Sequence, residues 1–417
     1  MKVFGQNFSG RRKTGRRYSQ QVRGFTTIEL DMTDRKLPIY LDYQSTTPVD
    51  PAVVEAMLPY FTDQYGNAHS SNHAFGWTAA EAVATARARL ARTIGAQPEE
   101  IIFTSGATES INIAMVGVVG GANTKTPHIV SVKTEHKAAL STLSRLEQQG
   151  CEVTLLDVDE QGLIRKSQIE HAITPNTVLV NVMAVNNEIG VVQPVKEIAA
   201  LCADRDVPFH TDLAQAVGRL PLHVGRSRIA MASLSAHKFY GPKGIGALYC
   251  RRDLQQRISP LLSGGGQEQG LRSGTLPVPL VVGMGVASEL AAKRRVAESK
   301  RLLTLRDAFL DALRAHVPDL IVHGSLEHRV PGNLSIAFPG VDADALLGLI
   351  PDIAVSLGSA CTSAAPEPSH VLVALGIPYE IANSSLRIGF GHPTSEDDAL
   401  YAAGRIGSAV RELHAAA

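Results

Sequence analysis

The sequence predicts an α/β protein with a large domain built on a mostly parallel β-sheet and a smaller α+β domain. From about residue 79 to residue 250, short apolar segments alternate with helix-length amphipathic segments, and strands joined by helical crossovers pair in parallel. After Gly270 this alternation gives way to a long helical segment, then to mixed strands and helices. The chain has 417 residues, more than the roughly 250–300 at which a single core stops growing, so we expect two domains.

The large domain contains seven segments with the length and apolar content of buried strands. Between them, segments 79–95 and 195–205 have the 3.6-residue apolar period of helices. Such helices cover both faces of the sheet, and ligands bind at the carboxyl ends of its strands. The strand candidates are residues 101–104, 128–131, 152–156, 178–183, 208–212, 231–235 and 246–250.

The C-terminal part is predicted to form the smaller domain. It contains, in order, a helix over about 280–316, a strand at 333–338, a helix at 342–350, a small-residue loop around Cys361, a strand at 385–390 and a helix from about Ser395. The strand-like segment near residue 40 is expected to join it, as the first and last parts of a chain often do. The predicted parts are a basic N-terminal extension at 1–37, a large domain at 48–290, and a small domain at 38–47 and 291–417.

Charge is unevenly distributed along the chain. Lys+Arg and Asp+Glu both number 40, and this formal net charge of zero argues against a dedicated nucleic-acid binder. Met1–Ile28 nevertheless holds seven basic residues and no acidic one. This leader lacks the apolar core of a secretory signal, and three interpretations stay open: a disordered arm, an organellar transit peptide, or sequence upstream of a true start at Met32. No uncharged apolar run reaches the ~18–20 residues that span a bilayer, so we expect a cytoplasmic protein, with mitochondrial targeting as the minor alternative.

The four cysteines occur without a CxxC pair, which argues against a disulfide framework or a structural zinc site and favours a reducing compartment. Cys151, Cys202 and Cys250 lie at or beside apolar segments and are predicted to be small buried hydrophobic side chains. Cys361 instead lies among small residues in the segment 358–366, which is unlike the burial site of an inert thiol.

The segment 235–244 is the most informative candidate for chemistry. Lys238 follows a strand and precedes a glycine-proline turn, where partial desolvation lowers the pKa of an amine and makes it a nucleophile. A surface lysine is the alternative interpretation. Asp212 ends a strand at the same sheet edge, where a carboxylate suits the ring nitrogen of pyridoxal phosphate and where a helix cap is the alternative. Gln215, three residues on, is placed to reach the ring hydroxyl.

Two further segments supply groups for the same site. Residues 101–110 give a strand, a glycine turn and a helix N-terminus in that order, an arrangement that binds phosphate but also occurs in ordinary helix capping. Ser235 and His237 add donors beside Lys238. His136 begins a helix after another strand, where an imidazole can stack on a flat ring and move protons, or simply face solvent.

Eight motifs together resemble the cysteine desulfurase family. In chain order over residues 40–390 they are LDYQSTTPVDP, FTSGATES, TEHKA, VNNEIG, HTDLAQAVG, SAHKFYGPKGIGALY, GGGQEQGLRSGT and GSACTS. The resemblance implies a pyridoxal-phosphate-dependent enzyme of fold type I, aminotransferase class V, in the subgroup with the longer cysteine loop. It also implies conversion of L-cysteine to L-alanine, with the sulfur held as a persulfide. Only the leader and the last residues lie outside the resemblance.

The resemblance assigns roles to individual residues. Lys238 would hold the cofactor covalently, Asp212 would pair with the ring nitrogen, and His136 would be the ring-stacking base. Cys361 would be the nucleophile that receives the sulfur, with a transient iron–sulfur cluster as its one implied metal contact. The resemblance also implies that Ala107, Thr108, Ser235 and His237 bind the cofactor phosphate, and that Thr275 binds the phosphate in the other subunit of a homodimer. Gln215 would bind the ring hydroxyl. Asn187 would contact both the cofactor and the substrate carboxylate, and Arg387 would bind the substrate carboxylate.

Several alternatives stay open. A selenocysteine lyase or another fold-type-I lyase is the nearest other enzyme, and a non-catalytic platform that binds sulfur-pathway proteins is the alternative from another class. The expected sulfur acceptors serve iron–sulfur cluster assembly or RNA or DNA thiolation. Housekeeping members of the family continue past the position of Ala417 into a tail that docks the iron–sulfur scaffold, so delivery to that scaffold is a weaker expectation than the desulfurase chemistry. His69 and His73 lie four apart, but the family has no metal at the similar segment. The segment 391–393, Gly-His-Pro, departs from the usual Gly-Arg-Phe, and Leu213 replaces a small residue.

Overall fold

The main β-sheet has seven strands in the order β2-β8-β7-β6-β5-β3-β4. In the computed structural model, which describes residues 37–357 and 368–416, β3, β4, β5, β6 and β7 pair in parallel, and β8 runs antiparallel to β2 and β7. Each strand candidate corresponds to one of these strands, so the predicted mostly parallel sheet is confirmed. The strands are β2 Ile101–Thr104, β3 His128–Val132, β4 Glu152–Leu156, β5 Thr177–Asn181, β6 Phe209–Asp212, β7 Met231–Ser235 and β8 Gly246–Cys250.

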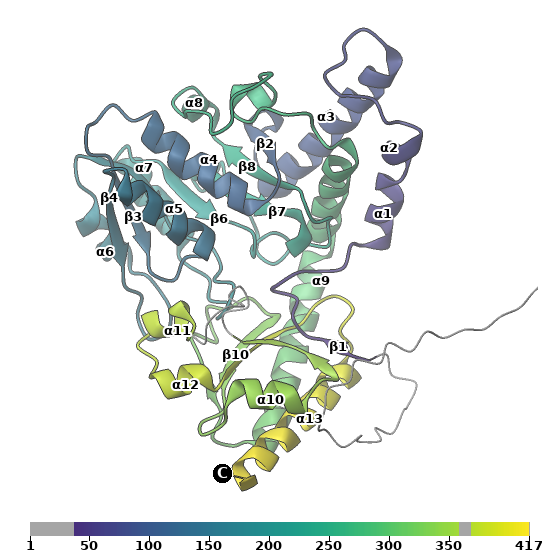
Figure 1. The fold of residues 1–417 in the computed structure, drawn as a ribbon, viewed down its shortest axis with the longest axis vertical. Helices are drawn as coiled ribbons and strands as arrows, with labels where there is room; N and C mark the ends of the chain where they lie inside the picture. Colours follow the sequence, from purple (N-terminus) through teal and green to yellow (C-terminus); the bar gives the residue numbers. More distant parts are fainter. Residues whose placement is uncertain (1–36, 358–367, 417) are drawn as a thin grey trace, which may run out of the picture. The chain divides into compact units, whose positions relative to one another are not determined.

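Helices bury both faces of this sheet, as Figure 1 shows. On one face, Val130 and Val180 belong to a core cluster that includes α3 (Ala74–Ile94), α7 (Val195–Asp204) and the first part of α9 (Val278–His316). On the other face, Ile129 and Leu179 pack with α4 (Ala107–Gly120) and α5 (Lys137–Gln148). Successive strand residues therefore enter different cores, which is why these strands read as continuous apolar runs rather than alternating ones.

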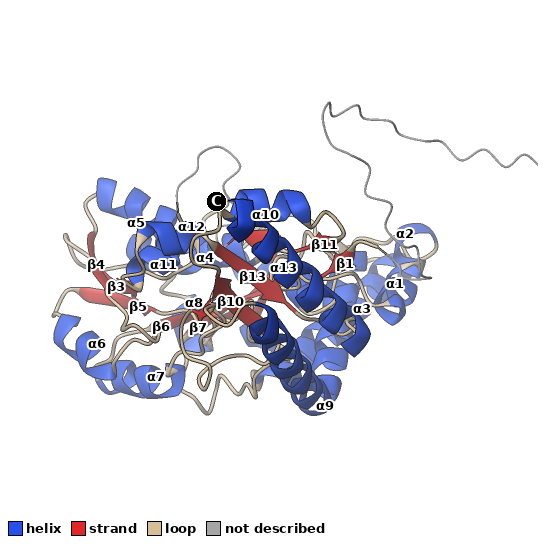
Figure 2. Ribbon diagram, turned by 90° about the horizontal axis from the view of Figure 1, so that it is seen from below, coloured by secondary structure: helices blue, strands red, loops and turns tan. Residues whose placement is uncertain are grey.

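A second sheet has four strands in the order β12-β13-β10-β9, all paired antiparallel. A separate parallel pair joins β1 to β11, so the segment near residue 40 does join the C-terminal part, as expected. Figure 2 shows α13 and α10 beside these strands. The elements are β1 Ile39–Tyr40, β9 Ile321–Val322, β10 Asn333–Ala337, α10 Ala343–Leu349, β11 Ile353–Ala354, β12 Ser356–Leu357, α11 His370–Ala374, α12 Tyr379–Asn383, β13 Ser385–Gly389 and α13 Glu396–Ala416.

Helix α9 links the two sheets (Figure 1). Its N-terminal part contributes Val281 and Ala287 to the core of the large sheet, whereas Phe309 near its other end stacks edge-on against Phe390, just after β13, at 5.2 Å between ring centroids. The predicted domain boundary between residues 290 and 291 falls inside this one helix, and the division into domains stays a prediction. Within the described ranges, no helix is both long enough and apolar enough to cross a membrane.

Local sequence signals set the start of helix α1 and the end of helix α3. Asp50 caps α1 by accepting from the amide of Ala52, and a proline follows it at the first helical position. Helix α3 ends at Gly95, whose φ is +70°, and a Cβ there would lie 2.6 Å from the ring of His223. The remaining helices are α1 Pro51–Met57, α2 Pro59–Thr62, α6 Lys166–Ala172 and α8 Arg252–Gln255, with 3-10 turns η1 Pro98–Glu100, η2 Ala236–Lys238 and η3 Glu268–Gly270.

Candidate active site

A cavity of about 610 Å³ opens where the central parallel strands end, the position at which ligands bind to such sheets. Two predicted residues do not line it: Thr275 is exposed on a separate segment, and Cys361 lies outside the described residues. The predicted residues that do line the cavity are Ala107, Thr108, His136, Asn187, Asp212, Gln215, Ser235, His237, Lys238 and Arg387.

Lys238 lies in the 3-10 turn that follows β7 and is half-buried. Its Nζ donates to the main-chain oxygens of Gln44 and Ser45, at 2.7 Å each. The segment that carries these oxygens also holds the turn, because the amide of Thr47 donates to the oxygen of His237 at 3.0 Å. The lysine is therefore fixed at the cavity wall by a chain segment almost two hundred residues away.

Asp212 ends β6 and is only 6% exposed. Its Oδ1 accepts from the amide of Ala214 at 2.7 Å. Burial raises the pKa of this carboxyl to about 6, although the Ala214 amide and the charge of Lys238 lower it. The ionised form of a buried carboxyl is stabilised by a cationic partner in the cavity, and a protonated pyridine nitrogen would be such a partner.

The opposite end of the cavity is built for an anion. Helix α4 begins at Ala107, after Gly106, without a side-chain cap, so its first amides are available to a ligand in the cavity. A Cβ on Gly246 would lie 2.5 Å from Cα of Gly106, so a glycine is needed where β8 passes beneath this turn. Burial and the charge of Lys238 lower the pKa of His237 to about 4, and its Nδ1 lies 3.0 Å from Oγ1 of Thr46.

His136 caps α5, and its Nδ1 accepts from the amide of Ala138 at 3.1 Å. Burial, together with the charge of Lys238, lowers the pKa of His136 to about 4. The ring is therefore neutral near pH 7. Because Nδ1 accepts a hydrogen bond, the proton of this neutral ring is on Nε2.

Arg387, on β13, is 3% exposed. Its guanidinium donates to the oxygen of Asn187 at 3.1 Å, to Oδ1 of Asp42 at 2.8 Å and to Oγ of Ser45 at 2.6 Å. Its Nε is buried with no hydrogen-bond partner in the described ranges. The side chain is therefore held rigidly at the cavity wall, as recognition of a carboxylate requires.

The cavity has further lining residues to which the sequence assigned no role. Gln44, Ser45 and Thr46 belong to the motif LDYQSTTPVDP, which supports the family resemblance but assigns no role to these positions. Gln44 accepts through its main-chain oxygen from Nε2 of Gln215 at 2.9 Å, so the amide predicted to reach a ring hydroxyl also bonds to the protein. Lys137, Glu188 and His370 line the cavity as well.

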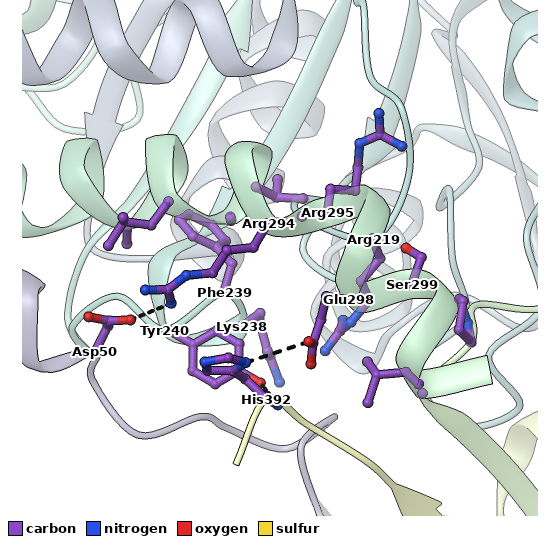
Figure 3. Close-up of a pocket in the computed structure, with 18 of the residues that line it drawn as sticks. Asp50, Arg219, Lys238, Phe239, Tyr240, Arg294, Arg295, Glu298, Ser299 and His392 are labelled. Carbon is purple, nitrogen blue, oxygen red and sulfur yellow. Dashed lines mark hydrogen bonds and ion pairs between the residues drawn. The ribbon is translucent and has the colours of Figure 1, made fainter. Parts of the chain in front are cut away.

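A second cavity, of about 60 Å³, lies on another side of Lys238 (Figure 3). In it Arg294 pairs with Asp50 at 2.5 Å, and His392 lies 3.5 Å from Glu298. His392, which departs from the family pattern, therefore belongs to this second cavity and does not line the larger one.

The larger cavity fits pyridoxal phosphate. It combines a buried carboxylate for the ring nitrogen, a lysine, and a helix N-terminus with Ser235 beside it for the phosphate. No group of three or more His, Cys, Asp or Glu side chains that could hold a metal ion occurs in the part of the chain that the structure describes. His73 instead caps α3 through its Nδ1.

Comparison with known proteins gives a consistent result. The aminotransferase class-V family matches residues 39–401. Cysteine desulfurase IscS of Rickettsia prowazekii is 48% identical over 377 residues, which cover 90% of this chain and 92% of that protein; the same enzyme of Rickettsia akari is 50% identical with the same coverage. A solved NifS-like protein has a TM-score of 0.83 and 34% identity, covering 89% of this chain and 99% of its own. SspA in complex with cysteine has a TM-score of 0.76 and 38% identity, covering 84% and 98%.

Proposed function

The chain belongs to the cysteine desulfurase family of pyridoxal-phosphate-dependent enzymes, and we propose that it converts L-cysteine to L-alanine with the sulfur held as a persulfide on Cys361. The observation that carries this proposal is the single cavity that brings Lys238, Asp212, His136 and Arg387 together. Bound pyridoxal phosphate supplies an electron sink for the substrate. The protein must then hold the cofactor, orient the amino acid and move protons.

Asp212 and Lys238 would hold the two ends of the cofactor ring. Asp212 would pair with the ring nitrogen, and Lys238 would exchange its contacts with Gln44 and Ser45 for the cofactor. The phosphate would take the free amides of the first turn of α4, at Ala107 and Thr108. Ser235 and His237 would add donors from the turn that carries the lysine.

Arg387 and Asn187 would orient the substrate through its carboxylate. The guanidinium is fixed by Asp42 and Ser45, so little side-chain freedom is lost when a carboxylate binds. Lys238 would move protons at its Nζ, close to the substrate carbon. His136, neutral with its proton on Nε2, would donate that proton or a hydrogen bond into the cavity.

Sulfur transfer would follow from Cys361, which lies outside the described residues. Its thiolate sulfur would form a bond to the substrate sulfur while the substrate's carbon–sulfur bond breaks. The electron pair of that bond stays with carbon, which then takes a proton and becomes the methyl group of alanine. The attacking cysteine is left as a persulfide.

The decisive measurement is the yield of alanine and sulfide from L-cysteine. A second measurement compares the turnover of L-cysteine with that of selenocysteine. We expect Cys361→Ser to abolish both products, whereas Cys151→Ser, at a buried thiol, should leave them unchanged. Parental rates from Cys361→Ser would refute the assignment of the nucleophile. A strong preference for selenocysteine would instead favour the lyase alternative.

We also propose that the enzyme is a homodimer. Four large side chains near the first helices are more than half exposed: Phe61 at 57%, Tyr65 at 66%, Phe75 at 51% and Trp77 at 59%. An exposed apolar group of this size favours an interface. Arg272, three residues before Thr275, pairs with Glu109 of α4 at 2.9 Å, so the segment predicted to reach the other subunit is anchored beside the phosphate end of its own cavity. Sedimentation of Trp77→Glu, expected to be monomeric, tests this.

The acceptor that we propose is an iron–sulfur scaffold protein, because the IscS relatives are 48–50% identical over nine-tenths of the chain. A reducing, cytoplasmic location fits Cys151, Cys202 and Cys250, which are buried and unpaired. Transfer of labelled persulfide sulfur to purified candidate acceptors would separate this role from RNA or DNA thiolation.

A further inference from the structure

A row of buried polar side chains crosses the large sheet below the cavity. On the face covered by α4 and α5, strands β3, β5 and β7 carry Ile129, Leu179 and Met231, all in the apolar core. Two residues later on the same face, the same strands carry Ser131, Asn181 and Ser233. Buried parallel strands are normally apolar throughout, so this change of chemistry needs a reason.

Hydrogen bonds join these residues through His210 of β6. Nδ2 of Asn181 donates to Oγ of Ser131 at 3.0 Å, and the two nitrogens of His210 contact Oδ1 of Asn181 at 2.6 Å and Oγ of Ser233 at 2.8 Å. All four residues are fully buried. An amide oxygen only accepts, so Nδ1 of His210 carries the proton and Ser233 donates to Nε2. All hydrogen bonds of this buried polar row therefore donate in the same direction, from Ser233 through His210 and Asn181 to Ser131, and they hold the Asn181 side chain in place.

The row ends beside two carboxyl groups. Asp212 is two residues after His210 and therefore faces the same side of the sheet. Glu135, which follows β3, is fully buried. Its Oε1 accepts from the amide of Met183 at 2.6 Å, and its Oε2 is buried without a hydrogen-bond partner among the described residues. Among the ion pairs of residues 37–357 and 368–416, none joins Glu135 to a cationic side chain.

An ionised Glu135 would be costly in this place. A fully buried carboxylate without a cationic partner loses its hydration and regains little, and a second carboxylate nearby repels it. Burial, helped by the charge of Asp212, raises the pKa of Glu135 to about 8, although interactions with the Met183 amide and the Asn181 side chain act in the opposite direction. The other ionisable groups around it are tied elsewhere: His210 in the row, His136 on the amide of Ala138, and His370, whose Nε2 donates to the main-chain oxygen of Glu135 at 2.9 Å.

We propose that Glu135, supported by the buried polar row, is a positioning residue for Asp212: as a neutral carboxyl it adds no second negative charge beside Asp212. The proposal rests on the proposed function, because it gives Asp212 a cationic ring nitrogen as its partner. Two carboxyl groups in different surroundings thus divide their tasks, one charged toward the cavity and one neutral behind it.

Glu135→Gln tests the charge state, because glutamine has the same shape, can still accept from Met183 and is neutral at every pH. We expect the cofactor-free variant to bind pyridoxal phosphate at pH 7 within about 3-fold of the parent, in an absorbance titration that needs no turnover. Its infrared spectrum should lack one protonated-carboxyl band that the parent shows at pH 7. A loss of affinity of about 10-fold or more, or an unchanged infrared spectrum, would overturn the neutral assignment. Glu152→Gln, at an exposed position, is the matched control.

Asn181→Leu and the milder Ser233→Ala test the support. Disturbing the surroundings of Glu135 should weaken pyridoxal phosphate binding about 10-fold at pH 7 for Asn181→Leu, and about 3-fold for Ser233→Ala. If both variants lose thermal stability but bind the cofactor as the parent does, the row is only structural and the proposal is wrong. If the parent binds pyridoxal phosphate as expected but makes no alanine, the proposed function fails while these binding results still decide the role of Glu135.

Discussion

Arg387→Lys should lower kcat/KM for L-cysteine by about 10²–10³-fold. The arginine is held by three acceptors, on Asn187, Asp42 and Ser45, and a substrate carboxylate would share or replace some of these contacts. One ammonium group cannot keep these contacts and also bind the substrate at two points. Losing one positioning bond and one substrate bond, each about 1.5–2 kcal/mol for charged groups, removes about 3–4 kcal/mol of transition-state stabilisation.

The assay is initial-rate alanine formation over a range of L-cysteine concentrations, with cofactor content measured on the same samples. Most of the loss should appear in KM, because the arginine would bind the carboxylate in both the ground state and the transition state. Cofactor content should not change. Arg405→Lys, the matched control, replaces an arginine that pairs with Asp352 away from the cavity. It should leave kcat/KM unchanged. An Arg387→Lys variant within 3-fold of the parent would show that this guanidinium does not bind the substrate.

Four further predictions concern single changes. Lys238→Ala should lower alanine formation by at least 10³-fold while the folded protein still binds pyridoxal phosphate, reversibly, as dialysis will show. Burial lowers the pKa of His136 to about 4 and the pKa of His210 to about 3. Below about pH 6.5 the unfolded chain therefore binds protons that the folded chain does not. The free energy of unfolding of the cofactor-free protein should fall as the pH drops from about 6.5 toward 4, by on the order of 3 kcal/mol for His136. Urea titrations of His136→Gln should show a shallower fall. Gly95→Ala combines a left-handed φ with a Cβ 2.6 Å from a ring, and should cost about 2 kcal/mol or more in the same assay. Deleting residues 1–31 should leave activity within 2-fold; a large loss would show that this segment belongs to the fold.

The strands of the large sheet were predictable because all except the edge strand β4 are short runs buried on both faces. Residues 101–104, 152–156, 231–235 and 246–250 form strands with the predicted bounds. The two-residue strands β1, β9, β11 and β12 carry too few residues to show a period. Their positions depend on pairing between distant segments, as when Ile39 pairs with Ile353.

The site was predictable where a residue type and its position after a strand point to one chemistry, as for Lys238 and Asp212. The roles of Asp42 and Ser45 were not, because each acts on Arg387 across more than 340 residues. Glu135 gave no signal for a similar reason: a glutamate in sequence is usually solvated and charged. Only the burial around it and the nearby Asp212 change that expectation.

The segment 44–47 competes with the cofactor for Lys238 in the cofactor-free enzyme. In the structure the ammonium of Lys238 is bound by two main-chain oxygens of this segment, and the adjacent Ser45 hydroxyl is bound by Arg387. Any ligand that engages the lysine must first displace it from those oxygens. The observed binding free energy of the cofactor is therefore less favourable than its intrinsic binding free energy, by the free energy needed to displace Lys238 from these oxygens. Changes that loosen segment 44–47 should speed loading of the cofactor while weakening the grip on the substrate.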